Sequence, residues 1–212
     1  MTAHRPGRPE DLPDPNQLWT RWAALAVASS DTDEDYDWYL PFSWYLHWAN
    51  RSGTWLGIAR YDGGRFVLFG EDEGSQTKWH EPPIDVLAEA PAWLPLDEIR
   101  DLVSDYMIGF VYWYEGDVWH RAPYPETLTD DGLSFSMTSL DLGTSEDAAS
   151  VLAEWCEDHD KDPAARLEFL ARAEEGAIAD DVLDKLAEHT KVDIVELKSL
   201  ARRFNLIADG LA

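Results

Sequence analysis

Hydrophobic and polar residues alternate with a period of two over much of residues 42–140, as in strands with one buried face. The alternation is clearest in 42–48, where Phe, Trp and Leu occupy every second position. Two further strand-like runs, 54–61 and 65–70, are joined by Asp62-Gly63-Gly64, whose glycines permit the positive φ angles of a tight hairpin. The pattern predicts a three-stranded antiparallel meander over 42–70, and a helix starting at Pro41 is the competing prediction.

Other segments of this half of the chain alternate less regularly. Apolar positions at helical spacing predict helices over 16–29 and 95–105 and a short helical segment over 84–89. Residues 107–114 are apolar and aromatic, which suits a central strand, and residues 118–121 and 133–140 are predicted to add strands.

Beyond residue 144 the period changes, because strand-forming residues thin out and Ala, Leu, Glu and Asp dominate. Four helices are expected, over 145–158, 163–175, 178–189 and 192–205. Their boundaries rest on Pro163 at a first helical position, Gly176 as a stop and Asp193 as a cap.

The expected fold class is therefore α+β: an antiparallel β-sheet built from a meander and a hairpin, with flanking helices and a C-terminal all-helical region. We expect three parts: a mobile, proline-rich N-terminal tail over 1–15, an α+β domain over 16–142, and a helical region over 143–212 that packs on it or forms a small subdomain.

Charge adds the strongest functional indication. The 212 residues include 42 acidic and 17 basic side chains, which gives a formal net charge of -25. The content of hydrophobic residues, 45%, is too high for a disordered acidic chain. Phosphate-tracking nucleic-acid binding and adhesion to an anionic membrane both require an excess of Lys and Arg. The composition therefore argues against both and favours a basic protein as partner.

The compartment is inferred from missing signals. Cys156 is the single cysteine and cannot form an internal disulfide. Residues 1–15 lack the apolar stretch of a secretory signal, and no run approaches about 18 apolar residues. We expect a cytoplasmic protein.

Two acidic stretches with neighbouring aromatic residues form the predicted partner-binding site. Acidic side chains repel one another and remain solvated, and Trp or Tyr beside them supplies interface anchors. The candidate residues are Asp31, Asp33, Glu34, Asp35, Asp37, Trp38, Tyr39, Glu71, Asp72 and Glu73. The alternating aspartates resemble a calcium loop, but Tyr36 and Phe42 occupy the positions where that loop needs Gly and Glu. No metal and no cofactor is therefore expected.

Three functions are compatible with these features. The first is a non-enzymatic acidic module that binds a basic protein, as immunity proteins, antitoxins and nucleic-acid mimics do. The second is a metal-dependent hydrolase, with His80, Glu81, Asp117 and His120 as candidate residues, because two short segments share the pattern W-H-x-x-P. The third is a structural or regulatory protein whose charge serves solubility or salt tolerance. No catalytic motif is present, and the first function is preferred. Residues 182–204 have the outline of a helix–turn–helix, but the acidity of the chain favours a packing role.

Overall fold

The computed structural model describes residues 7–30, 39–41, 46–49, 54–71, 75–106, 108–133 and 144–207. These residues form an antiparallel sheet and several helices, which confirms the predicted α+β class. The chain divides into two compact units: a sheet unit made of residues 1–15 and 42–140, and a helical unit made of 16–41 and 141–212. The division differs from the expected one because the helix that follows the N-terminal segment groups with the C-terminal helices.

Five described strands of the sheet unit lie side by side in chain order, each antiparallel to the next. They are β2 (Leu46–Ala49), β3 (Trp55–Tyr61), β4 (Arg65–Glu71), β5 (Phe110–Glu115) and β6 (Val118–Arg121). The predicted hairpin joins β3 to β4: Tyr61 pairs with Arg65, and Gly63 and Gly64 have φ angles of 76° and 72°. Residues 42–45, 50–53 and 134–140, to which strands or a turn were assigned, lie outside the described part of the chain.

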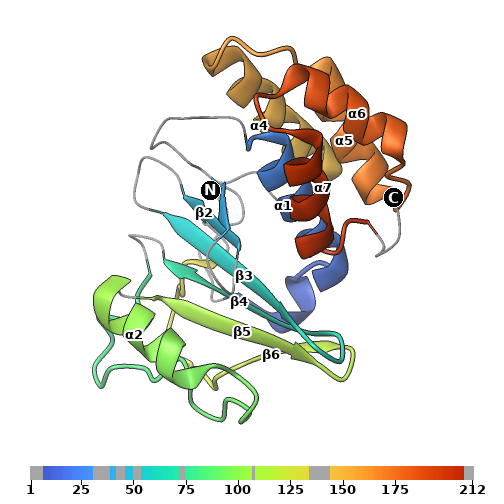
Figure 1. Ribbon diagram of the computed structural model, residues 1–212. Coiled ribbons are helices and arrows are strands. Elements are labelled where there is room, and N and C mark those ends of the chain that lie inside the picture. The colour runs from blue at the N-terminus through green and yellow to red at the C-terminus, as the bar shows by residue number, and fades with distance from the viewer. Residues whose placement is uncertain are drawn as a thin grey trace. The chain divides into compact units, whose positions relative to one another are not determined.

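One hydrophobic cluster of the sheet unit lies on the face of the strands under helix α2 (Leu96–Tyr106), which crosses that face in Figure 1. Residues of the opposite face, such as Leu68 and Tyr112, are also fully buried. In register, Phe69 of β4 lies beside Val111 of β5, and Val67 lies beside Trp113. Ile99 of α2 is fully buried against this layer. The central strands β3, β4 and β5 are therefore buried on both faces over most of their length, and they do not show the alternation of a strand with one buried face.

The short helical segment expected over residues 84–89 is instead a turn, so this prediction is wrong. The Ala88 N–H donates to the carbonyl of Asp85, three residues back as in a turn, and Glu89 has a φ of 64°. Proline residues stand on both sides of the segment. A helix of so few residues does not recover its nucleation cost, whereas the turn still places Val86 and Leu87 in the core.

The N-terminal segment is attached to the sheet unit from residue 7 onward, in contrast to the mobile tail expected over residues 1–15. It contains a short 3₁₀ helix, η1 (Pro9–Asp11), which contacts β6. The indole N–H of Trp119 donates to the carbonyl of Pro13 at 2.9 Å, and the Arg121 guanidinium donates to the carbonyl of Gly7 at 3.1 Å. The prolines limit regular structure here, but side chains from the sheet hold the backbone.

The helical unit contains one helix from the N-terminal half of the chain and four consecutive helices from the C-terminal part (Figure 1). They are α1 (Pro15–Ala28), α4 (Ser145–Asp158), α5 (Ala164–Glu174), α6 (Asp180–His189) and α7 (Ile194–Arg203); the short strand β1 (Tyr39–Pro41) belongs to the same unit. The predicted end signals are confirmed: Gly176 has a φ of 67° just after α5, and Asp193 accepts a bond from Val195 N–H.

Local packing joins α1 to α7. Trp19 of α1 donates its indole N–H to the carbonyl of Phe204 at 2.8 Å, and the two rings meet edge to face at 6.1 Å. Cys156 is buried in α4, as expected for a small apolar side chain rather than a reactive thiol. Within the described residues, no helix is long and apolar enough to cross a membrane.

Candidate functional site

Most of the predicted partner-binding residues cannot be placed. Tyr39 begins strand β1 and Glu71 ends strand β4, but the remaining eight residues lie outside the described part of the chain: Asp31, Asp33, Glu34, Asp35, Asp37, Trp38, Asp72 and Glu73. Whether the two acidic stretches form one surface therefore stays a prediction.

Glu71 is a largely buried, ion-paired carboxylate and not a freely solvated one. Its carboxylate forms an ion pair and hydrogen bond with Lys78, and 17% of its side chain is exposed. Lys78 in turn lies over the ring of Trp79, with its Nζ atom 5.9 Å from the ring centroid. Glu71 therefore connects the end of β4 to the loop that carries Trp79.

Trp79 is an exposed aromatic side chain, with 69% of its surface accessible. It borders an open depression of about 570 Å³, which is lined by Lys78, Trp79, His80, Glu81, Pro82 and Pro83. Trp38 and Tyr39 are the aromatic residues of the predicted binding site, and Trp79 is not among them. Its position between turn-forming residues and Pro82-Pro83, outside any alternating run, is the signal that could have identified it.

The loop around Trp79 is held from both sides by hydrogen bonds. Both ring nitrogens of His80 are engaged, Nδ1 with the carbonyl of Pro82 at 2.9 Å and Nε2 with the Thr127 hydroxyl at 3.0 Å. The backbone N–H of Gln76 donates to the carbonyl of Asp130, so the start of the loop is also fixed. An exposed indole on a backbone held in this way loses little conformational freedom when a ligand binds.

The histidines proposed for a hydrolase do not form a metal site in the described residues. No group of three or more His, Cys, Asp and Glu side chains there is arranged to hold a metal ion. His80 binds Pro82 and Thr127 through its two ring nitrogens, whereas His120 bonds the carbonyl of Glu115 and stacks on Trp113. The two W-H-x-x-P segments also differ, because Trp79 is exposed and Trp119 is buried.

Helix α4 presents an acidic face. Its buried residues, Ala148, Leu152, Trp155 and Cys156, lie on one side. The opposite side exposes five residues: Glu146, Ser150, Glu154, Glu157 and Asp158. At 100° per residue these five positions fall within about one third of the helix circumference. None of the four carboxylates is ion-paired with another described side chain, and α4 contains no Lys or Arg.

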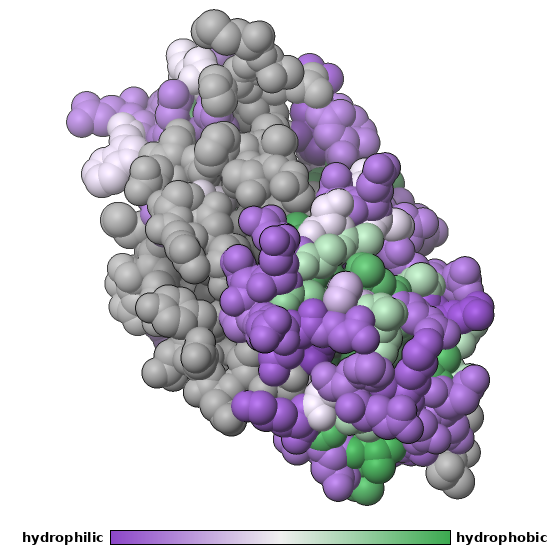
Figure 2. Space-filling model, turned by 90° about the horizontal axis from the view of Figure 1, so that it is seen from above, coloured by the Kyte–Doolittle hydropathy of each residue, from purple (hydrophilic) through white to green (hydrophobic). Residues whose placement is uncertain are grey.

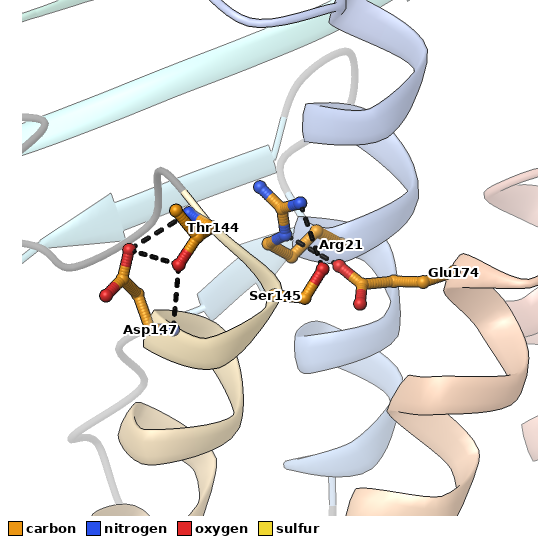
Figure 3. A network of polar contacts seen from close by, with 5 residues as sticks. All are labelled: Arg21, Thr144, Ser145, Asp147 and Glu174. Carbon is orange, nitrogen blue, oxygen red and sulfur yellow. Dashed lines mark hydrogen bonds and ion pairs between the residues drawn. The ribbon is translucent and has the colours of Figure 1, made fainter.

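The N-terminus of α4 is fixed by a capping box, in which Asp147 N–H donates to the Thr144 hydroxyl and Thr144 N–H donates to the Asp147 carboxylate. Figure 3 shows this cap beside Arg21 of α1, which points toward Glu174 of α5 and Ser145. Arg21 Nε lies 2.7 Å from a Glu174 oxygen, and 5% of Arg21 is exposed. These contacts hold α4 within the helical unit and leave its acidic face outward.

A second basic residue is buried deeper in the helical unit. Arg166 of α5 is fully buried and donates to the carbonyls of Ala28 and His189, which are the last residues of α1 and α6. Its guanidinium also lies 5.1 Å from the Trp155 ring centroid. Carbonyl groups at helix C-termini carry partial negative charge, so these two contacts stabilise the buried cation.

The sheet unit contains a buried carboxylate that serves structure. Asp131 is fully buried and accepts bonds from the Gly7 N–H at 2.9 Å, the Tyr112 hydroxyl at 2.7 Å and the Leu133 N–H at 3.3 Å. Burial, with the charge of Asp131 adding to it, raises the pKa of the Tyr112 phenol. At ordinary pH Tyr112 therefore stays a hydrogen-bond donor, and Asp131 anchors the N-terminal segment.

Hydrophilic side chains cover most of the described surface seen in Figure 2, with small hydrophobic areas between them. Comparisons with protein-family models, curated proteins and solved structures find no match.

Proposed function

We propose that this protein is a non-enzymatic acidic binding module that engages a basic protein, in the manner of an immunity protein, an antitoxin or a nucleic-acid mimic. The observation that carries the proposal is the outward face of α4. Four carboxylates lie there without a basic residue in the helix and without ion pairs to other described residues. A surface of this kind attracts a cationic partner and speeds its association at low salt.

The placement of basic residues supports the same function. The chain has 17 Lys and Arg against 42 Asp and Glu. Arg166 and Arg21 are buried inside the helical unit, and Lys78 is paired with Glu71. These cations do not offset the acids of the outer surface, so the field that a partner encounters is more negative than an even mixture would give.

Two variants with equal charge change test whether α4 is a specific surface. The first removes three charges from α4, as E154Q/E157Q/D158N. The second removes three from the exposed row of α6, as D181N/D184N/E188Q, where all three residues are also exposed. Each variant and the wild-type protein are used to capture proteins from the native lysate at low salt. A captured protein is then purified, and its affinity for the wild type and for each variant is measured at several salt concentrations.

We expect the wild type to capture a basic protein, and we expect the wild type and the α6 variant to bind that protein with similar affinity. The α4 variant should bind it at least about tenfold more weakly, because each lost charge pair at a partly desolvated interface contributes on the order of 0.5–1 kcal/mol. Equal weakening by both variants would mean that charge acts only as a general coat. Capture of no basic protein by the wild type would reject the function.

A further inference from the structure

We infer that the Trp79 loop is a second contact surface for the basic partner, at which an arginine side chain stacks on the Trp79 ring and pairs with the Glu81 carboxylate. The inference rests on the proposed function, because it takes a basic protein as the occupant. It concerns the sheet unit, whereas the acidic face of α4 belongs to the helical unit.

Exposure is the first reason. Trp79 has 69% of its surface accessible, so its ring is open to contact from outside the chain. Trp is also the residue type most enriched at the energetic centres of protein interfaces.

Charge decides which occupant fits. Residues 71–89 contain six acidic side chains and a single basic one, Lys78, which is already paired with Glu71. Glu81, which is exposed, lines the same depression as Trp79. A π-face beside an uncompensated carboxylate selects a cation, and arginine suits both groups because its planar guanidinium stacks on the ring and hydrogen-bonds carboxylates.

The loop already shows that this ring accepts a cation. Lys78 lies 5.9 Å from the Trp79 centroid while its ammonium group is held by Glu71. Because Trp79 is 69% exposed, most of the ring remains available beyond Lys78. The His80 bonds to Pro82 and Thr127 keep the loop in place, so binding needs little reorganisation.

The test uses the full chain labelled with ¹⁵N and a capped six-arginine peptide as the probe, with a six-glutamate peptide as the negative comparison. The Trp79 indole N–H signal is identified by its loss in Trp79→Phe. Titration at moderate salt should shift this signal, and the affinity read from it should fall about three- to tenfold in Glu81→Gln. A six-lysine peptide should bind this site more weakly than the arginine peptide.

Variants separate the anchor from general apolar surface. Trp79→Ala should lower the affinity for the basic protein captured from the lysate about three- to tenfold. Trp79→Phe keeps an aromatic face, so its affinity for that protein should stay within about twofold of the wild-type value. Val195→Ala removes a side chain that is 73% exposed on α7 and should have no effect. Circular dichroism confirms that each variant is folded.

The outcomes distinguish the two proposals. Shifts of the α4 amide signals without a shift of the Trp79 indole would overturn this inference and leave the proposed function standing. Shifts at Trp79 with no change at α4 would overturn the proposed function, because that function depends on the acidic face of α4. Unchanged partner affinity in Trp79→Ala also overturns the inference, and absence of any shift with the arginine peptide overturns both.

Discussion

In the sheet unit a fully buried charged side chain is a carboxylate, Asp131, whereas the helical unit buries the guanidinium groups of Arg21 and Arg166. Asp131 is satisfied by two backbone N–H groups and a tyrosine hydroxyl. Arg166 donates to carbonyls at two helix ends, and Arg21 contacts a carboxylate and a serine hydroxyl. Asp131 and Arg166 thus bind backbone groups, whereas Arg21 binds side chains.

The difference teaches how a very acidic chain can fold. Loops beside a sheet offer unpaired N–H donors, and a buried carboxylate accepts them; helix C-termini offer unpaired carbonyls, and a buried arginine donates to them. Arg21 and Arg166 are buried inside the helical unit and do not face the exposed carboxylates of α4. Other surface acids of this unit do have basic partners, such as Glu168 with Lys185 and Asp180 with Lys198.

The largest expected effect is that of Arg166→Ala. It removes a buried cation that contacts three helices and leaves the carbonyls of Ala28 and His189 without this donor. We expect the free energy of unfolding of the helical unit to fall by about 3–5 kcal/mol. Urea unfolding followed by circular dichroism measures this, with Arg172→Ala, on the exposed side of α5, as the matched control within about 0.5 kcal/mol. If the two variants are equally stable, the buried arginine does not hold the helices together.

A smaller loss is expected for Asp131→Asn in the sheet unit. The amide keeps the shape of the side chain but replaces one acceptor by a donor, which conflicts with its N–H and O–H partners. A loss of about 2–3 kcal/mol is expected, together with faster hydrogen exchange of the Gly7 amide. Glu126→Gln, an exposed site with the same charge change, serves as the control. Unaltered exchange at Gly7 would show that Asp131 does not anchor the N-terminal segment.

The smallest effect is expected at the surface pair of Glu168 and Lys185. Hydrogen bonding and charge from Lys185 lower the pKa of Glu168, and Glu168 raises the pKa of Lys185 in the same way. Because the folded-state pKa of Glu168 is depressed, its contribution is present above the unfolded value of about 4.3 and is lost as pH falls through the folded pKa. Carbon-13 NMR titration should show the Glu168 pKa rising toward its ordinary value in Lys185→Gln. No rise would mean that the pair does not form in solution, and stability itself should change little because both groups are exposed.

Local sequence signals predicted individual elements well. The Asp62-Gly63-Gly64 hairpin, the stop at Gly176 and the cap at Asp193 depend on neighbouring residues alone, and all three are present. The prediction for segment 84–89 is wrong because its apolar spacing fits a helix, whereas the flanking prolines and the packing of Val86 and Leu87 in the core favour a turn. Of the candidate site, only Glu71 and Tyr39 can be placed, and Trp79 was missed because exposure is not encoded in residue type.

The sequence by itself determined the α+β class, the order of most helices and strands, and the excess of acid, since each follows from short-range periodicity or from counting. Only the tertiary structure decided which charges are internal and which are outward. Arg166, Arg21 and Asp131 find partners more than a hundred residues away in the chain. Such pairings depend on how elements pack, and for that reason the bare face of α4 and the exposed ring of Trp79 become visible only in the folded protein.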